Sequence, residues 1–506
     1  MNFASVLAEA ARLFPDNTAV KTVVIRDGDQ LTYKELDRMV NRLASGLASL
    51  GVRKGDRVAI YVPYNWPETL VAYFAAARAG AVTVFIDSLY TAPEAAYIIG
   101  DSSSGVIVTT KDRWEALAGQ PGVEDTVRRA VLVDHPGGEG KTAGYRDLAE
   151  SSAGDFTPVD CLPDDVAVLG YTSGTTGRPK GAMITHGNLC FQVSYGTAPI
   201  QLNCRDRFLA VVPLTHSYMF AAALGRLVKC GAALVLMGRF MPDKCLEVVQ
   251  NEKITALSGT PVVFAHLLKA YGRAGYDVSS LRLCTTGGSP VPGQVWRDFQ
   301  DTFKVDLIEV YGLTETSVAV TIDGADGERV QESAGRAAFA TRIKIVGDDG
   351  RELPAGEVGE VAVSGPQVMK GYWNRPAETA EVLRDGWFLT GDLGRVDDRG
   401  YLFIVDRKKD MILTSGYNVY PREVEEVLYG HGAVLEAAVA GVPDPVRGEL
   451  VKAFIIPRPG SEADPEEIAA FCRERLAPYK VPRQIEIVEQ LPRTAAGKVQ
   501  RYRLRG

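Results

Sequence analysis

One segment of the sequence combines three kinds of residue that bind polyphosphates. Residues 171–186 read YTSGTTGRPKGAMITH, between an apolar run that predicts a strand and one that predicts a helix. Its hydroxyls, glycines and lysine include Thr172, Ser173, Gly174, Thr175, Thr176, Gly177 and Lys180. Glycines let backbone N–H groups approach an anion closely, and a lysine neutralises its charge. We therefore predict a polyphosphate clamp, although no Ser or Thr follows the lysine as in a Walker A loop.

A second group of polar residues follows another predicted strand. The apolar run 305–310 leads into YGLTET, residues 311–316. Tyr311 would lie at the carboxyl edge of a parallel sheet, where ligands bind, and can stack on a flat base. Glu315 beside a polyphosphate requires a cation between them, and magnesium is usually held by one or two carboxylates plus phosphate oxygens. Without the neighbouring segment, both residues would be an ordinary core tyrosine and a solvated glutamate.

Three further motifs follow along the chain. They are TGD at 390–392, DRKKDMILTSGYNVYPREVE at 406–425 and PRTAAGK at 492–498. With residues 171–186 and 311–316, they form five motifs in the order of the adenylate-forming superfamily, which the chain resembles over nearly its whole length. That superfamily includes acyl-CoA synthetases, adenylation domains of peptide synthetases and beetle luciferases. The motifs are closest to those of fatty-acid or aryl-acid CoA ligases.

The resemblance implies roles for individual residues. Lys498, Lys180 and Thr314 are implied to be catalytic, and Glu315 is implied to bind Mg²⁺. Lys498 would bridge the carboxylate and the α-phosphate, and losing one such group typically costs about 10²–10³ in rate. The implied ATP- and AMP-binding residues are Thr172, Ser173, Gly174, Thr175, Thr176, Gly177, Lys180, Gly287, Gly288, Ser289, Glu309, Tyr311, Gly312, Thr314, Asp392, Arg407 and Lys498.

The implied reaction has two steps. A carboxylate first attacks the α-phosphorus of ATP and expels pyrophosphate, and a thiol then attacks the acyl-adenylate. Because two anions meet in the first step, catalysis depends mainly on positioning and on the positive charges of Lys180, Lys498 and Mg²⁺. By resemblance, Lys409 is the hinge about which a small domain rotates, and Gly416 borders the thiol channel. We therefore expect ATP, Mg²⁺ and coenzyme A to take part.

The acid substrate is less clearly marked. Residues 212–225, VPLTHSYMFAAALG, resemble the family's aromatic segment along the acyl pocket. The implied pocket residues are His216, Met219, Phe220, Thr260, Val262 and Gly287. The lone histidine is equally compatible with a core position. The segment contains no acid, so the ammonium group of an amino acid would lack a counter-charge. We therefore expect a fatty acid of medium or long chain, or an aryl acid.

Other readings of the same motifs remain open. The acceptor can be a carrier-protein phosphopantetheine. A basic patch of Arg493, Arg501, Arg503 and Arg505 would suit either an acidic carrier protein or the nucleotide of coenzyme A, so it does not separate the two. An oxidative, luciferase-like use of the adenylate would have the same fold. A non-catalytic AMP-binding protein would have lost its catalytic groups. The chain instead retains all of Lys180, Glu315, Asp392, Arg407 and Lys498.

The composition of the chain indicates which class of protein and which cellular compartment suit this chemistry. The 506 residues are 46% hydrophobic with a net charge of −7, which argues against nucleic-acid binding because phosphates require an excess of cations. Seven cysteines without a CxxC pair predict reduced thiols. We find no secretory signal and no stretch long enough to span a membrane, so we expect a cytoplasmic protein. The oligomeric state stays open, a homodimer included.

The elements that must position these residues alternate between strand and helix up to about residue 335. Short apolar runs such as 58–62 and 106–110 predict strands. Thr32 and Glu35 form a capping box before a helix whose stop signal is Gly51. This alternation predicts α/β layers with largely parallel sheets.

The pattern changes in the last third of the chain. Short runs separated by Gly, Asp and Pro predict a β-rich subdomain, and the final hundred or so residues predict a small mobile α+β domain. The expected fold is therefore a large N-terminal domain of two α/β subdomains and a β-rich subdomain, followed by the small domain. We expect the adenylation domain at 1–405, the hinge at 406–410 and the C-terminal domain at 411–506.

Overall fold

The first α/β layer surrounds a sheet with the strand order β7-β6-β5-β3-β4-β8-β9. The computed structural model describes residues 2–24, 28–138, 140–152, 154–172, 178–196, 198–324, 328–330, 332–494 and 497–505. The strands are β3 (Arg57–Tyr61), β4 (Val82–Phe85), β5 (Val106–Thr109), β6 (Arg129–Leu132), β7 (Thr142–Gly144), β8 (Val166–Thr172) and β9 (Lys180–Thr185). All neighbours are parallel except β8 and β9. β4 and β5 are buried throughout, as expected of parallel strands covered on both faces.

The helices between these strands carry the signals expected from the sequence. They are α1 (Ser5–Leu13), α2 (Tyr33–Ser49), α3 (Pro67–Arg78), α4 (Ala92–Ser102), α5 (Lys111–Ala118), α6 (Val123–Thr126), α7 (Tyr145–Glu150), α8 (His186–Phe191) and the π-helix η1 (Gln192–Gly196). The predicted capping box is confirmed, because Thr32 and Glu35 satisfy each other's backbone N–H groups. The helix α3 is almost wholly buried, as its apolar sequence requires.

The second layer surrounds a sheet with the order β16-β15-β14-β13-β12-β10-β11-β1-β2. Its strands are β1 (Thr18–Val23), β2 (Gln30–Thr32), β10 (Arg207–Ala210), β11 (Ala233–Met237), β12 (Ala256–Gly259), β13 (Leu283–Gly287), β14 (Leu307–Tyr311), β15 (Thr321–Ile322) and β16 (Arg336–Ala337). The helical segments are the π-helix η2 (Tyr218–Ala223), α9 (Leu224–Cys230), α10 (Pro242–Glu252), α11 (Pro261–Ala274), α12 (Gly293–Phe303) and the 3₁₀ helix η3 (Thr314–Thr316). Strands β1 and β10–β14 run parallel, so their carboxyl ends share one edge.

The last third of the chain forms two smaller sheets. One has the order β17-β18-β20-β19 with β21 on β20, from β17 (Arg342–Val346), β18 (Gly359–Ser364), β19 (Leu383–Arg384), β20 (Trp387–Val396) and β21 (Leu402–Arg407), plus helix α13 (Pro376–Val382). The other has the order β23-β22-β25-β24 with β26 on β25. It contains β22 (Ile412–Thr414), β23 (Tyr417–Val419), α14 (Pro421–Tyr429), β24 (Val434–Asp444), β25 (Gly448–Pro457), α15 (Pro465–Arg473), β26 (Gln484–Ile487) and the 3₁₀ helix η4 (Arg501–Arg503).

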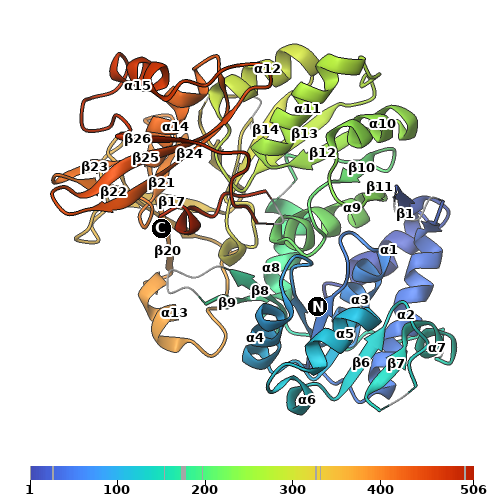
Figure 1. Ribbon diagram of the computed structural model, residues 1–506. Helices are drawn as coiled ribbons and strands as arrows, with labels where there is room; N and C mark the ends of the chain where they lie inside the picture. Colours follow the sequence, from blue (N-terminus) through green and yellow to red (C-terminus); the bar gives the residue numbers. More distant parts are fainter. Residues whose placement is uncertain are drawn as a thin grey trace.

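The hydrophobic cores follow this division. One large cluster joins both α/β layers, with Phe85 of β4 stacked on Phe220 of η2 at 4.7 Å between ring centroids. The C-terminal sheet has a separate cluster that includes Val424, Ile455 and Ile468. Figure 1 shows this last part, in orange and red, beside α12 and β14. The expected fold class is confirmed, with a large α/β part followed by a small C-terminal part that has its own core.

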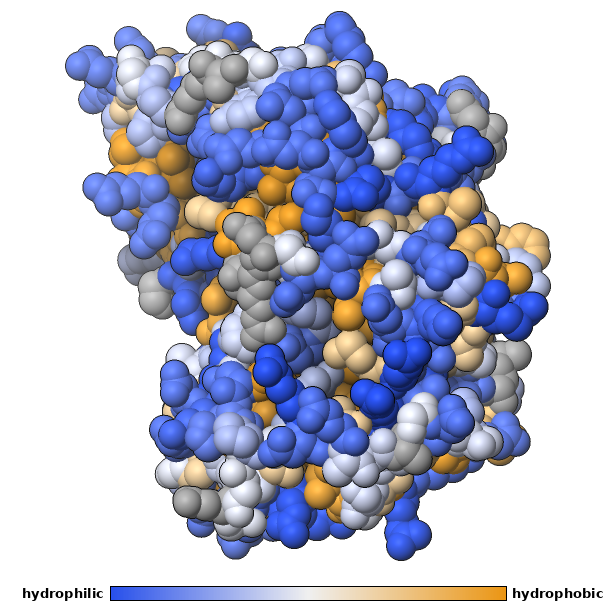
Figure 2. Space-filling view, turned by 90° about the vertical axis from the view of Figure 1, so that its right-hand side faces the viewer, coloured by the Kyte–Doolittle hydropathy of each residue, from blue (hydrophilic) through white to orange (hydrophobic). Residues whose placement is uncertain are grey.

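The surface is mainly polar. The face in Figure 2 is largely hydrophilic, with hydrophobic residues gathered in small groups. Across the described ranges, no helix combines the length and apolar character needed to cross a membrane. All seven cysteines are free thiols.

Candidate active site

The carboxyl ends of β13 and β14 meet the start of β9 at one edge of the molecule's large part. Gly287 ends β13 and Tyr311 ends β14, where the two strands pair in parallel. Gly312 follows, and a Cβ atom there would lie only 1.2 Å from the carbonyl oxygen of Val318. Only glycine fits this close approach, so the turn that leads to η3 depends on it.

Glu315 in η3 is the centre of a buried polar cluster at this edge. It is 8% exposed, and its Oε1 accepts hydrogen bonds from Thr172 Oγ1 at 3.2 Å and from the Tyr372 hydroxyl at 2.9 Å. The Nζ atom of Lys180 lies 5.5 Å from the centroid of the Tyr372 ring. Thr314 packs against β8, since a Cβ at Gly170 would come within 2.5 Å of its Cγ2. The sequence-predicted residues Thr172, Lys180, Thr314 and Glu315 therefore converge.

The remaining residues of the predicted clamp are Ser173, Gly174, Thr175, Thr176 and Gly177, which lie outside the described residues. Tyr372 was missed by the sequence reasoning, because no motif marks it. Burial, followed by the charge of Glu315, raises the pKa of the Tyr372 hydroxyl, so this group stays a hydrogen-bond donor.

The donor set around Glu315 suits a cation shared with phosphate. No cluster of three or more His, Cys, Asp or Glu side chains capable of holding a metal occurs in the described part of the chain. A lone buried carboxylate among hydroxyls fits Mg²⁺, which keeps water ligands and binds phosphate oxygens as well. It does not fit a metal held by protein ligands alone.

Asp392 and Arg407 form a cross-strand pair next to Tyr311. The two residues lie opposite each other in β20 and β21, and Arg407 Nε is 3.0 Å from Asp392 Oδ1. The Tyr311 hydroxyl donates to the other carboxylate oxygen at 2.9 Å. Three residues predicted to contact adenosine thus meet across two sheets. The carboxylate of Asp392 is 4% exposed and offers the acceptors that a diol requires.

Lys498 approaches the same place from the far end of the chain. The charge of Arg407, followed by burial, lowers the pKa of Lys498 to about 7, while Asp392 opposes the shift. Burial and the charge of Lys498 lower the pKa of His216 to about 4. At Gly497 a Cβ would lie 3.0 Å from Thr260 Oγ1, so the loop rests on the start of α11. The structure therefore brings Lys498, Arg407, Asp392, His216 and Thr260 together.

Other predicted residues lie around this centre. Gly288 has a φ of +83° and, with Ser289, follows β13. Glu309 of β14 faces α14, where burial raises its pKa to about 7 against the opposing charge of Arg422. Lys409 follows β21, and Gly416, with a φ of +82°, turns between β22 and β23 with open space where a Cβ would be.

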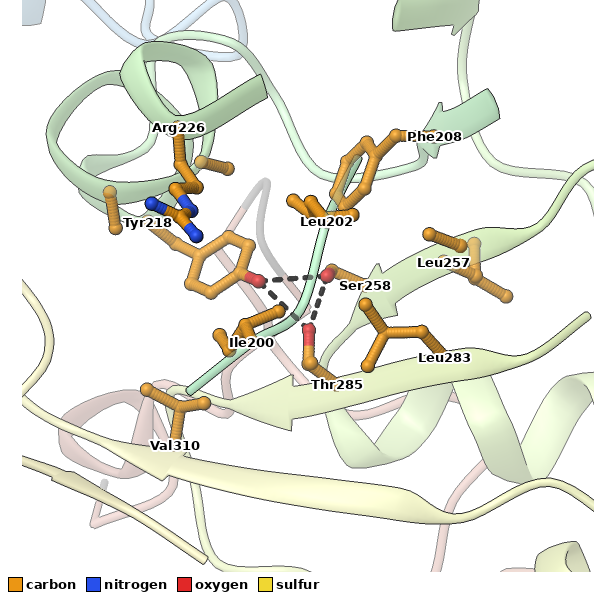
Figure 3. A pocket seen from close by; sticks show the side chains of 13 residues that line it. Ile200, Leu202, Phe208, Tyr218, Arg226, Leu257, Ser258, Leu283, Thr285 and Val310 are labelled. Carbon is orange, nitrogen blue, oxygen red and sulfur yellow. Dashed lines mark hydrogen bonds between the residues drawn. The ribbon is translucent and has the colours of Figure 1, made fainter. Parts of the chain in front are cut away.

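An apolar pocket extends from this edge into the second layer (Figure 3). It lies between η2 and strands β10, β12, β13 and β14. Its lining is mostly apolar and comprises Ile200, Leu202, Phe208, Tyr218, Ala222, Ala223, Arg226, Ala256, Leu257, Ser258, Leu283, Thr285 and Val310. Ser258 and Thr285 each precede, by two residues, a residue of the catalytic edge, Thr260 and Gly287. Because residues of a strand alternate between its two faces, Thr285 and Gly287 of β13 are on the same face of the sheet.

Three hydroxyls form a triangle inside this pocket. The Tyr218 hydroxyl lies 2.8 Å from Ser258 Oγ and 2.8 Å from Thr285 Oγ1, and the two latter oxygens are also hydrogen-bonded (Figure 3). When each hydroxyl donates to the next, every donor in the ring is used, and lone pairs remain free to accept. The triangle can therefore receive a hydrogen bond from a bound molecule.

The side chains predicted for an acyl pocket have different positions from this lining. His216, Thr260 and Gly287 lie at the catalytic edge, and Val262 lies in the first turn of α11. Met219 and Phe220 are fully buried in η2, with Phe220 stacked on Phe85. None of the six is among the residues that line the pocket of Figure 3. Tyr218, from the same segment of the sequence, lines this pocket, and the acyl-pocket roles of the six residues stay predictions.

Comparison with known families identifies the chain. Residues 7–373 match the model of the AMP-binding enzyme, and residues 423–498 match that of the AMP-binding enzyme C-terminal domain. The chain belongs to the AMP-binding enzyme family. This AMP-binding enzyme is therefore a member of the adenylate-forming superfamily, as its motifs predicted.

Individual relatives cover nearly the whole AMP-binding enzyme. A feruloyl-CoA synthase of Amycolatopsis sp is 42% identical over 97% of this chain and 95% of its own. A long-chain-fatty-acid–CoA ligase of Bacillus subtilis (strain 168) is 38% identical over 99% and 93%. Among solved structures, the anthranilate CoA ligase AuaEII in complex with anthranoyl-AMP gives a TM-score of 0.92 at 28% identity, covering 100% of this chain and 96% of that one. The chain is an AMP-forming acyl-CoA synthetase, as expected.

Proposed function

We propose that Lys498, Lys180 and Glu315 compensate the negative charge of the substrates when this ligase joins a carboxylic acid to AMP. The two lysines would do so directly, and Glu315 would do so by binding Mg²⁺. A carboxylate oxygen bonds to the α-phosphorus of ATP, and pyrophosphate leaves with the electron pair of the broken P–O bond. The position of Lys498 beside Asp392 and Arg407 carries the proposal. A cation fixed at that point faces the charge that develops during the attack.

The lowered pKa of Lys498 fits this role. In the free site, Arg407 and burial bring the pKa of the lysine to about 7. The negative charges of ATP and carboxylate favour the protonated lysine when they bind. The ammonium group is thus most stable when both anions are in place, which links its charge to the presence of the substrates.

Mg²⁺ would be held by Glu315, with phosphate oxygens and water as its other ligands. When bound, it would supply charge neutralisation on the triphosphate. Thr172 and Tyr372 hold the carboxylate of Glu315 in one orientation through their hydrogen bonds. Lys180, above the Tyr372 ring, adds a second positive charge on the same side.

The acid that best fits the pocket is a compact aromatic acid with a hydroxyl at its far end. The pocket lies between η2 and strands β10, β12, β13 and β14, and its lining is mostly apolar. From Gly287 back to Leu283, strand β13 advances about 13 Å. The triangle of Tyr218, Ser258 and Thr285 lies within that depth and can accept a hydrogen bond from a phenol. The similarity to a feruloyl-CoA synthase supports the same class.

A fatty acid is the second candidate. The rest of the lining is apolar, with Ile200, Leu202, Phe208, Leu257 and Leu283. A long-chain-fatty-acid–CoA ligase is 38% identical to this chain. An alkyl chain would leave the three hydroxyls bonded only to one another, so it would gain nothing from the triangle.

Coenzyme A is the proposed thiol, and its sulfur would attack the acyl carbonyl as AMP leaves. Three of the four arginines of the possible carrier-protein patch pair with carboxylates of the small domain or of the hinge. Arg493 pairs with Glu436, while Arg501 and Arg505 contact Asp410. These pairs leave Arg503 as the exposed arginine of the set, which favours a small thiol over an acidic carrier protein.

We further propose that the small domain, residues 411–506, turns about a hinge at 406–410 between the two steps. β21 ends at Arg407 and β22 begins at Ile412, so the intervening residues join two separate sheets. This turn would carry Lys498 away and bring Gly416 towards the thiol. We place the reaction in the cytoplasm, where the seven free thiols would stay reduced.

ATP–pyrophosphate exchange over a panel of acids tests the proposal. The panel should include hydroxylated and plain aryl acids, fatty acids of increasing length and amino acids. We expect exchange with an aryl or fatty acid that falls about 10²–10³-fold in Lys498→Ala. Exchange with amino acids alone, or equal exchange in Lys498→Ala, would refute the proposed site. Adding coenzyme A to the active acid should then release AMP and form the thioester.

A further inference from the structure

A buried carboxylate joins the small domain to helix α11 of the large one. Glu436 of β24 is 4% exposed and pairs with Arg493, and its Oε1 lies 3.3 Å from His266 Nε2. Burial alone would raise the pKa of Glu436, but contact with His266 and Arg493 holds this pKa below its usual value. Glu436 therefore stays ionised between two cationic or hydrogen-bonding partners. One partner lies in its own domain, and the other lies across the interface.

Arg493 stands at the base of the loop that carries Lys498. Its Nη1 donates to the carbonyl of Gly497 at 2.6 Å, and its backbone pairs with Val499. The N–H of Lys498 also donates to Thr494 Oγ1 at 3.2 Å. The guanidinium of Arg493 thus connects Glu436 to Gly497, the residue before Lys498. A change in the position of Glu436 is therefore expected to change the position of the loop.

Helix α11 contacts this assembly at two points. Thr260, at the start of the helix, meets Gly497. His266 lies six residues further on, about 9 Å along the helix axis, and meets Glu436. The two contacts fix both the tip and the base of the loop on one rigid element. A third contact across the interface, in which Gly293 N donates to Glu426 at 3.4 Å, involves α12 and α14.

We propose that His266 is a positioning residue that holds the small domain in the arrangement needed for adenylate formation. This inference rests on the proposed role of Lys498 and on the proposed turn of the small domain. The His266–Glu436 contact joins two parts that must separate when the small domain turns, whereas the Arg493–Glu436 pair lies within the small domain and is kept. His266 therefore favours the first half-reaction and takes no part in the second.

The size of the effect follows from two-state reasoning. A contact present in only one of two arrangements shifts their populations by its own free energy. Removal of His266 leaves Glu436 paired with Arg493, so no buried charge is orphaned and the variant should fold. We expect a shift of about five- to tenfold away from the adenylating arrangement, within the usual range of coupling between sites.

The test separates the half-reactions in His266→Ala, His266→Gln and wild type. Pyrophosphate release in a single turnover without coenzyme A reports adenylate formation, and coenzyme A added to supplied acyl-adenylate reports thioester formation. We expect His266→Ala to slow the first about five- to tenfold and not to slow the second, because the population lost from one arrangement enters the other. His266→Gln should recover part of the loss, because its amide can still donate to Glu436. Lys244→Ala, which removes an exposed pair with Glu247, is the matched control.

The outcomes distinguish this inference from the proposed function. Equal losses in both half-reactions would show a general structural role for His266, and no loss in either would show that the contact does not hold the domain. Both results overturn the inference. Lys498→Ala in the same assays tests the underlying role, because adenylate formation that survives this change refutes the site whatever His266→Ala shows.

Discussion

The hydroxyl of Tyr372 donates a 2.9 Å hydrogen bond to Glu315, which joins residues 57 positions apart. The N–H of Met369 also donates to the backbone carbonyl of Glu315, at 2.7 Å. The segment before α13 therefore holds η3 from two sides. Because Glu315 is the carboxylate proposed for Mg²⁺, this segment determines where the metal would bind.

Replacing Tyr372 by Phe should weaken the response to Mg²⁺. Glu315 would keep its hydrogen bond from Thr172 but lose the stronger contact, at a cost of about 1 kcal/mol or roughly a fivefold change. We expect the Mg²⁺ concentration for half-maximal pyrophosphate exchange to rise about three- to tenfold, with little change at saturating Mg²⁺. A Mg²⁺ titration of both proteins measures this. Tyr417→Phe, at an exposed tyrosine of the small domain, should leave the titration unchanged.

Asp392→Asn should impair both nucleotide binding and stability. The change leaves Arg407 without its charged partner and weakens the acceptor for the Tyr311 hydroxyl. Breaking a fully buried pair from one side typically costs about 3–5 kcal/mol, and the cost is smaller here because Arg407 is half-buried. We expect a clearly lower Tm and a KM for ATP raised about tenfold or more. Thermal unfolding and initial rates measure these effects, and an unchanged KM would place the ribose elsewhere.

Lys498, the lysine proposed to be catalytic, should reduce stability at neutral pH. Its folded-state pKa of about 7 lies below the ordinary lysine value, so folding disfavours the charged form. The cost is complete below about pH 7 and disappears as pH rises towards the ordinary value, where the unfolded chain also loses the proton. Lys498→Met should therefore raise Tm at pH 6–7, and the gain should shrink towards pH 10. A gain that is independent of pH would mean that the lysine is not held in this environment.

Much of the site could be predicted because its motifs directly follow strands. Tyr311 ends β14, Gly287 ends β13, and parallel strands bring such ends to one edge. The capping box of α2 was likewise predictable from the sequence, because Thr32 and Glu35 are only three residues apart. The domain boundaries and the assigned roles of the site residues remain predictions.

The features that the sequence did not reveal depend on contacts between distant segments. β1 joins β11 of the second sheet rather than the neighbouring first sheet, a pairing across more than 200 residues that no local pattern marks. The hydroxyl triangle combines Tyr218, Ser258 and Thr285 from three separate elements. Each of these residues by itself has an ordinary local sequence. Only the packing of η2 on the sheet brings their oxygens within hydrogen-bonding distance.

The hydroxyl triangle yields a prediction about specificity. If it receives a phenol, removing one corner should affect acids with a distal hydroxyl and spare those without one. We expect Tyr218→Phe to lower kcat/KM for 4-hydroxycinnamic acid about tenfold, while kcat/KM for cinnamic acid stays within about twofold, because a site built for a hydroxyl loses most when that bond is lost.

The ratio of the two kcat/KM values is the decisive quantity, since it cancels any general effect of Tyr218→Phe on folding or on the catalytic edge. Thr285→Val, which keeps the side-chain shape and removes a second corner, should change the ratio in the same direction. Met219→Leu, at the buried neighbour that does not line the pocket, should leave it unchanged. A ratio that stays constant in Tyr218→Phe and Thr285→Val would mean that the hydroxyls only hold η2 in contact with β12 and β13. The apolar residues that line the pocket would then favour a fatty acid as the substrate.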